Sequence, residues 1–265
     1  MTELWDTMAQ TEVPPDAAAL WWLGQAGFAI KTPAGKVIYV DPYLSDAVER
    51  LFGFKRLSLP AIRAQDVRAD MVIITHEHAD HLDPDALPTI ARNNPRCRFA
   101  APLGCGEGLG NAGIAPDRRI LLEPGREHRL DGITVHAVPA DHGDLSPTAL
   151  GLTLDFGAVR ILVTGDTAFH PSLFEPLFDR RPDLVLPCIN GVFGNMNHLD
   201  AARFVAAAKP RFAIPCHYWT FAEQGGCDPA GFIFACKAMS PQTQALLLRP
   251  GETFFLTPAK PEPRA

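Results

Sequence analysis

The sequence predicts an α/β fold in which two β-sheets pack face to face and helices cover their outer sides. Short apolar runs typical of buried strands recur in the first half of the chain and again in the second, and helical patterns follow in each half. The chain has 265 residues, of which 47% are hydrophobic, so it can bury a large core. We therefore expect residues 1–265 to form a single domain.

The expected strands are short and rich in apolar residues, and turn residues bound them. They span residues 19–22, 28–31, 36–40, 71–75, 98–100, 133–138, 150–156, 159–163, 184–189, 212–215, 245–248 and 253–256. The expected helices follow capping residues. They span residues 85–93, preceded by Asp83 as N-cap and Pro84 in the first turn, 199–209, and 229–239, capped by Asp228.

The stretch His-Glu-His-Ala-Asp-His at residues 76–81 places four potential metal ligands directly after an apolar run. A strand that ends at Thr75 opens into a turn, where the first two histidines can face one ion while Asp80 and His81 face a neighbouring one. The spacing differs from the H-E-x-x-H helix pattern of zinc proteases, because the first two histidines are only two residues apart. It predicts a metal site between a strand and a helix.

The same motif resembles the signature of the metallo-β-lactamase superfamily, and other segments along most of the chain agree. Segments similar to its L-ascorbate-6-phosphate lactonase-like branch are Leu-Trp-Trp-Leu-Gly-Gln-Ala-Gly-Phe at 20–28, Val-Asp-Pro-Tyr at 40–43, Thr-Gly-Asp-Thr at 164–167 and Ile-Pro-Cys-His-Tyr at 214–218. The resemblance implies a four-layer αββα sandwich in which strand ends from both halves meet along one edge. It also implies a metal-dependent hydrolase.

The resemblance further implies which residues bind the metal ions. The first ion would be held by His76, His78 and His142, the second by Asp80, His81 and His217, and both by Asp166. An aspartate next to His142, either Asp141 or Asp144, is the alternative third ligand of the first ion. These nitrogen and oxygen donors suit zinc, manganese or iron.

Two adjacent divalent ions would support hydrolysis without a serine or cysteine nucleophile, and the sequence has no G-x-S-x-G elbow. A metal-bound hydroxide would attack a carbonyl polarised by one ion. Asp80, which would orient the hydroxide, and Asp166, which would bridge the ions, are the expected catalytic residues. The resemblance favours a lactonase that opens a sugar-acid or related lactone ring. The alternative is a metal-dependent phosphodiesterase acting on a small phosphodiester.

Two other classes of protein fit the sequence less well. A diiron oxygen or nitric oxide reductase resembles this fold, but usually has Glu where His78 stands and needs a flavin domain. A binding module that has lost catalysis would not be expected to keep the complete ligand set. We therefore expect an enzyme.

Substrate contacts are expected in two places near the ligands. The resemblance places the segment around Asn190 at the mouth of the cleft, where Asn195 and His198 follow it, and Tyr218 adjoins the last ligand. A plain turn is the alternative interpretation of the Asn- and Gly-rich segment.

Several charged residues and histidines have plainer interpretations. The cations Lys55, Arg56 and Arg63 precede the metal loop and are candidate contacts for a phosphate group, although solvated surface charge is the favoured interpretation. His136, within a strand, and His128, in the charged turn at residues 125–129 that precedes it, are expected to have structural roles.

Composition limits the partners and the location. The formal net charge is −6 and Lys and Arg form no cluster, which argues against a nucleic-acid-binding surface. No run approaches the roughly 18 apolar residues of a membrane span, and the N-terminus lacks a signal-peptide pattern, so we expect a cytoplasmic protein. Six scattered cysteines without a C-x-x-C pair are expected to be reduced. The expected partner is a small-molecule substrate, and relatives in the branch suggest a homo-oligomer.

Overall fold

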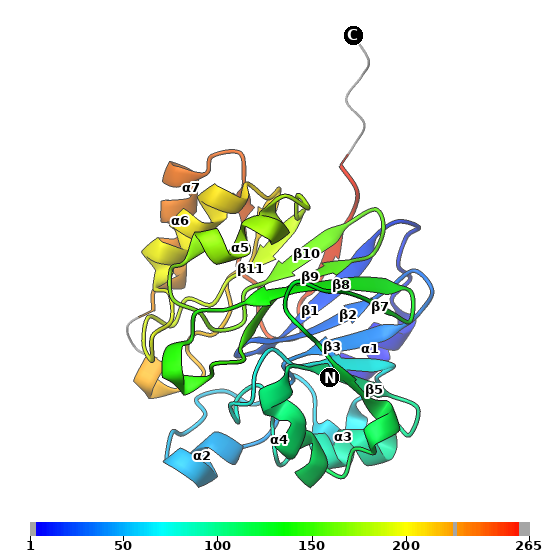
Figure 1. Cartoon of the computed structure of the whole chain (residues 1–265). Coiled ribbons are helices and arrows are strands. Elements are labelled where there is room, and N and C mark those ends of the chain that lie inside the picture. The colour runs from blue at the N-terminus through cyan, green and yellow to red at the C-terminus, as the bar shows by residue number, and fades with distance from the viewer. Residues whose placement is uncertain (1–3, 225–226, 260–265) are drawn as a thin grey trace.

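In residues 4–224 and 227–259, which the computed structural model describes, two seven-stranded mixed sheets pack face to face (Figure 1). The first sheet has the order β14 (Thr253–Leu256), β1 (Ala18–Gly24), β2 (Gly27–Lys31), β3 (Val37–Val40), β4 (Met71–Ile73), β5 (Arg98–Ala101) and β6 (Arg119–Leu121). The second has the order β13 (Gln244–Ala245), β12 (Phe212–Ala213), β11 (Leu184–Leu186), β10 (Arg160–Val163), β9 (Leu150–Asp155), β8 (Ile133–Pro139) and β7 (Glu127–Leu130). The predicted sandwich of two sheets is confirmed. The ends and one internal pair of residues of the predicted 1–265 domain lie outside the described part.

Helices cover the outer sides of both sheets (Figure 1). They are α1 (Leu4–Gln10), α2 (Ala47–Phe52), α3 (Leu87–Asn93), α4 (Gly106–Asn111), α5 (Pro171–Phe178), α6 (His198–Ala208) and α7 (Pro229–Met239). Apolar residues of α1, α3 and α4 share a core with the first sheet, and those of α5, α6 and α7 share one with the second. None of the helices in the described residues is long and apolar enough to cross a membrane.

Strand β1 shows why a strand of the first sheet appears in the sequence as a continuous apolar run. Its side chains alternate between the two faces, so Leu20 and Trp22 enter the core between the sheets while Trp21 and Leu23 enter the core under the helices. All seven residues of β1 are buried. Burial of both faces removes the polar alternation expected of a half-exposed strand.

The two sheets have matching hydrogen-bond patterns. Strands β1 to β3 pair antiparallel and β3 to β6 pair parallel. Likewise β7 to β10 pair antiparallel and β10 to β13 pair parallel. The end of β4 reaches the second sheet directly, because Leu150 donates its backbone N–H to the carbonyl of Thr75 at 3.1 Å. The loops that follow β4, β8, β10 and β12 therefore gather along one edge of the sandwich.

The helix expected at 85–93 begins later than predicted, at Leu87. The carboxylate of Asp83 does accept hydrogen bonds from the backbone of the next turn, at Asp85 and Ala86, but it also accepts them from Leu44 and Ser45. The segment after Asp83 is held as a turn by these contacts, and Pro84 precedes the helix instead of starting it.

The charged segment expected to be a turn around His128 is the strand β7. The turn prediction was wrong because charged side chains hide the pattern of an edge strand, where solvent on the open side tolerates them. The short helices α1, α2, α4 and α5 were also not predicted. Each has at most eight residues, too few for a clear helical period.

Candidate metal centre

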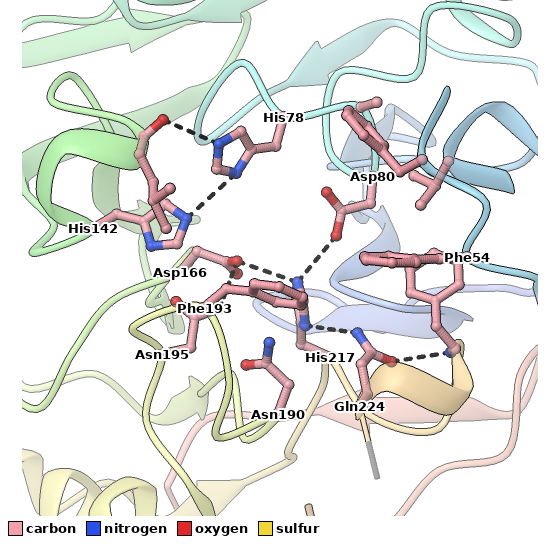
Figure 2. Close-up of a pocket in the computed structure, with 15 residues that line it drawn as sticks. Phe54, His78, Asp80, His142, Asp166, Asn190, Phe193, Asn195, His217 and Gln224 are labelled. Carbon is pink, nitrogen blue, oxygen red and sulfur yellow. Dashed lines mark hydrogen bonds and ion pairs between the residues drawn. The ribbon is translucent and has the colours of Figure 1, made fainter. Parts of the chain in front are cut away.

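Seven imidazole and carboxylate side chains from four loops converge at the edge where the two sheets end. Four of them lie in the loop after β4, and one each follows β8, β10 and β12. They are His76, His78, Asp80, His81, His142, Asp166 and His217. Figure 2 shows five of the seven directed into one pocket. The structure thus brings together all seven residues that the resemblance implied as ligands.

The loop after β4 is held from below by the buried carboxylate of Asp41. This carboxylate accepts hydrogen bonds from the backbone N–H of Thr75 at 2.8 Å, from the Thr75 hydroxyl at 2.6 Å and from Nδ1 of His81 at 2.8 Å. Backbone N–H groups of His81 and Leu82 donate to the carbonyl of His78 at 2.9 and 2.7 Å. These hydrogen bonds fix the conformation of the loop, so the closely spaced residues of the motif form a cluster of ligand atoms.

Three ring nitrogens converge in the first ligand group. Nδ1 of His78 lies 3.0 Å from Nε2 of His76 and 3.3 Å from Nε2 of His142. Burial, with a further contribution from neighbouring imidazoles, lowers the pKa of His76 well below its ordinary value, and burial lowers the pKa of His142. Both rings are therefore neutral near pH 7, which is the form of histidine that binds a metal ion.

The opposite nitrogens of two of these rings show where their protons lie. Nε2 of His78 donates to the carbonyl of Leu145 at 3.1 Å. Nδ1 of His76 lies 3.1 Å from the Thr75 hydroxyl, whose own hydrogen is directed at Asp41, so His76 is the donor. Nδ1 of His78 lies within 3.3 Å of the Nε2 atoms of His76 and His142. Three imidazole nitrogens this close to one another match the ligand set of a metal ion held by histidines, so this donor set fits a metal ion.

The second ligand group combines two imidazoles with a carboxylate. Nε2 of His217 lies 3.2 Å from Nε2 of His81 and 3.3 Å from Oδ2 of Asp80. Nδ1 of His81 is engaged by Asp41, which leaves Nε2 for the centre. Burial opposes a charge on both rings, but nearby carboxylates outweigh it. They raise the pKa of His217 to about 9 and the pKa of His81 well above its ordinary value.

Asp166 lies between the two groups. Its carboxylate oxygens are 3.4 Å from Nε2 of His81 and 3.2 Å from Nε2 of His217, and Nδ2 of Asn195 donates to it at 2.7 Å. Burial would raise the pKa of Asp166, but the two imidazoles hold it well below its ordinary value. Gly165 allows this placement, because it has a φ of +63° and a Cβ there would lie 2.8 Å from a backbone carbonyl of β9.

Two buried glutamines beneath the second group were not recognised from the sequence. Nε2 of Gln25 donates to Oδ2 of Asp80 at 2.7 Å, and Oε1 of Gln25 accepts from Nε2 of Gln224 at 3.0 Å. Nε2 of Gln224 also lies 3.1 Å from Nδ1 of His217. The only sequence signal was a glutamine in a Gly-Gln-Ala-Gly turn, and its partner lies far away along the chain.

The raised pKa values of the second group predict that metal binding releases protons. Below about pH 9 the His217 ring of the metal-free protein is protonated on both nitrogens and positively charged. The His81 ring is likewise charged near pH 7. A metal ion must displace these protons, so its apparent affinity should fall about tenfold per pH unit for each proton as the pH is lowered. Calorimetric zinc titrations at pH 7 in buffers of different ionisation enthalpy should show one to two protons released. Release of none would contradict the prediction.

The positions of the three side chains decide which one can be the third ligand of the first ion. His142 is the one that joins the cluster. The carboxylate of Asp141 turns to His170, whose Nδ1 lies 3.0 Å from it, and Asp144 is exposed. His142 is thus the residue that we retain for this position.

The predicted substrate contacts are divided between the pocket and other places. Asn190 and Asn195 line the pocket, and the side-chain oxygen of each is buried without a hydrogen-bond partner among the described residues. His198 starts α6, and Tyr218 stacks on Trp22 with 4.9 Å between ring centres. Neither belongs to the described residues that line the pocket.

The three candidate cations also lie outside the described lining of the pocket. The guanidinium of Arg56 donates to the carbonyls of Tyr43 and Ser45 at 2.8 and 3.3 Å, and Arg63 pairs with Asp66 at 2.5 Å. A phosphate group in the pocket would therefore find no lysine or arginine side chain among the described lining residues.

Comparison with known proteins agrees with this geometry. A family model described as the beta-lactamase superfamily domain matches residues 19–217, a range that holds all seven clustered side chains. The chain belongs to the metallo-β-lactamase superfamily.

Relatives of this metallo-β-lactamase superfamily member are named UPF0173 metal-dependent hydrolases. One from Cupriavidus taiwanensis is 32% identical over 262 residues, which cover 89% of this chain and 85% of the relative. Another, from Archaeoglobus fulgidus, is 29% identical over 246 residues, which cover 88% and 96%. The chain is therefore a metal-dependent hydrolase of this family.

Solved structures share the fold at lower identity. The metallo hydrolase Igni18 from Ignicoccus hospitalis superposes with a TM-score of 0.70 at 24% identity, covering 91% of this chain and 98% of Igni18. An isothiocyanate hydrolase from Delia radicum gut bacteria gives a TM-score of 0.72 at 20% identity, covering 89% of this chain and 98% of that protein. These likenesses confirm the metallo-β-lactamase fold.

Proposed function

We propose that this hydrolase holds two divalent ions and opens the ring of a lactone. The observation that carries the proposal is the convergence of seven imidazole and carboxylate side chains at one edge of the sandwich, five of which line a pocket. Their ligand atoms form three groups, and within each group all the atoms lie within 4.8 Å of one another. This spacing allows the side chains to share two metal ions.

The ligand groups divide between the two proposed ions as follows. His76, His78 and His142 would hold the first ion, Asp80, His81 and His217 would hold the second, and Asp166 lies where it could serve both. Zinc and manganese suit these imidazole and carboxylate donors, and iron is compatible with them. The outer nitrogens of His78 and His81 already donate to fixed acceptors, an arrangement that orients metal-binding histidines.

Divalent ions in this position lower the pKa of a water molecule and polarise a carbonyl group. Asp80 lines the pocket and keeps its carboxylate ionised, so it can orient the attacking water, and Gln25 holds that carboxylate in place. Asp166 is kept ionised by the adjacent imidazoles and oriented by Asn195. The unpartnered side-chain oxygen of Asn190 is placed to accept a hydrogen bond from the substrate.

The lining of the pocket favours an uncharged reacting group over a phosphodiester. No lysine or arginine is among the described lining residues, so a phosphodiester would depend on the metal ions alone for its countercharge. A lactone carbonyl carries no charge and needs no such partner. The resemblance of several segments to the lactonase-like branch points in the same direction.

The test compares the two substrate classes with and without metal. Protein loaded with zinc or manganese should hydrolyse lactones, a chelator should abolish the activity, and added metal should restore it. Lactone opening is followed with a pH indicator, and bis-p-nitrophenyl phosphate serves as the phosphodiester. Turnover of the phosphodiester together with no turnover of any lactone would overturn the proposed reaction.

A further inference from the structure

The pocket above the metal centre has a small, largely apolar lining. Its volume is about 230 Å³, below the roughly 300–1,000 Å³ usual for ligand pockets. The larger apolar side chains that line it are Val48, Phe52, Phe54, Leu145, Phe193 and Phe221. A pocket of this size and composition fits a small substrate with an apolar part.

The aromatic part of this lining is assembled from three distant segments. The ring centres of Phe54 and Phe193 are 6.0 Å apart with an interplanar angle of 25°, and those of Phe54 and Phe221 are 6.5 Å apart. Figure 2 shows the Phe54 and Phe193 rings side by side next to His217. An apolar group on a substrate that reaches the metal centre would therefore contact this wall of rings.

Phe193 has a strained backbone and an exposed apolar side chain. Its φ is +54°, a backbone conformation that is a rare outlier for a bulky residue, and 53% of its surface is exposed. Phe52 and Leu145 at the same pocket are also exposed, at 63% and 55%. Strained backbone and solvent-exposed apolar side chains are both features that gather at binding sites. Burial by a ligand would remove the exposure.

The ionisable side chains among the described residues of the pocket lining are Asp80, Asp166 and the three histidines of the metal centre. The nearby guanidinium of Arg56 lies over the Tyr43 ring, 4.2 Å from its centre, and donates to backbone carbonyls. It is therefore committed to the protein. An anionic substituent on the substrate would be desolvated against apolar rings without a countercharge.

We propose that the substrate carries a small, uncharged apolar substituent, a short alkyl chain or a single phenyl ring, that packs against Phe54, Phe193 and Phe221. This inference rests on the proposed function, because it places the reacting carbonyl beside Asp80 and Asp166. It narrows the substrate class to apolar lactones and sets aside the phosphorylated sugar-acid lactones.

The pocket can be tested by binding, independently of the reaction. Hydroxamic acids chelate metal ions, so acetohydroxamic, phenylacetohydroxamic and sulfoacetohydroxamic acids present a methyl, a phenyl and a sulfonate group to the pocket. Calorimetry with metal-loaded protein should show the phenyl compound binding at least about 10-fold more tightly than the methyl compound, since even one methylene in an apolar pocket is worth about 10-fold or more. The sulfonate, an anion that is a weak metal ligand, should make its compound bind most weakly.

Matched variants identify the residues responsible. Phe54→Ala and Phe193→Ala should each reduce the preference for phenyl over methyl by about 5- to 10-fold and leave acetohydroxamate affinity nearly unchanged. Phe234→Ala is the control, because Phe234 is 74% exposed on α7 and lies outside the pocket. Phe193→Arg should improve binding of the sulfonate compound at least about 10-fold.

The binding and turnover results distinguish the apolar pocket from the proposed lactone hydrolysis. Equal affinity for the methyl and phenyl compounds, or tightest binding of the sulfonate compound, overturns the apolar pocket and leaves the metal centre standing. A phenyl preference without hydrolysis of any lactone keeps the pocket but refutes the proposed reaction. No binding of any hydroxamate to metal-loaded protein refutes both.

Discussion

Replacing His78 with alanine is expected to reduce hydrolysis at least about 1,000-fold while leaving the fold intact. A bound metal ion contributes several kcal/mol to stabilisation of the transition state, and each 1.4 kcal/mol is about tenfold in rate. Nδ1 of His78 is the central atom of the first ligand group, within 3.3 Å of both other nitrogens. Its loss should remove the first ion. Steady-state rates with saturating lactone and metal measure the effect.

The free energy of unfolding should change little in the metal-free His78→Ala variant. The ring is only partly buried, and besides the carbonyl of Leu145 its polar contacts are the neighbouring ligand rings of His76 and His142. His128→Ala is the matched control, because His128 lies in β7 and bonds to the backbone of Glu123. Full activity in His78→Ala, or a large loss in His128→Ala, would show that the histidines are wrongly assigned.

The second large effect is expected for Asp41→Ala, which should lower both stability and metal affinity. Asp41 is fully buried, and its carboxylate accepts three hydrogen bonds from Thr75 and His81. Removing one partner of such a buried charged network costs about 3–5 kcal/mol. Losing the partner of a ligating histidine typically lowers metal affinity about 10- to 100-fold. Urea denaturation and zinc titration measure the two effects.

Two further variants separate the role of the Asp41 charge from that of its volume. Asp41→Asn keeps the size of the side chain but can no longer accept with both ends, so it should still lose much of the metal affinity. Asp85→Ala removes a carboxylate that makes an exposed ion pair with Arg50, which is worth about 0–1 kcal/mol, and should behave like the unaltered protein. An Asp41→Asn variant with unchanged zinc affinity would contradict a role for this carboxylate in orienting His81.

The fold could be predicted from the sequence wherever burial leaves a local pattern. Strands such as β1 and β10 are buried on both faces and appear as short apolar runs. Helix α7 begins at Pro229 with Asp228 as its cap, as predicted, because the cap and the proline are adjacent in the sequence. Strand β7 and the short helices lack such signals, since their positions depend on neighbours that are distant in the chain.

The candidate site was predictable to the extent that its residues follow strands. His76, His142, Asp166 and His217 each come a few residues after a strand, and strands of this sandwich end at a common edge. The supporting residues Asp41 and Gln25 also follow strands directly, β3 and β1. Single aspartate and glutamine residues in turns have no distinctive spacing, however, and their roles become visible only in their contacts with His81 and Asp80.

The character of the pocket was the least predictable feature. Phe54, Phe193 and Phe221 are scattered through the sequence and become neighbours only in three dimensions. The cationic side chains of Arg56 and Arg63 precede the metal loop in sequence, but the structure directs them to Tyr43 and Asp66. An expectation of phosphate binding based on sequence proximity therefore has no support in the described pocket lining.

The most direct test of the two-ion centre is the number of metal ions bound per chain, measured side by side in the unaltered protein and in His78→Ala. After loading with zinc and removal of loosely bound metal, elemental analysis should give two ions per chain for the unaltered protein and one for the variant. The same count in both proteins, or no retained metal in either, would contradict the centre that the seven side chains are proposed to form.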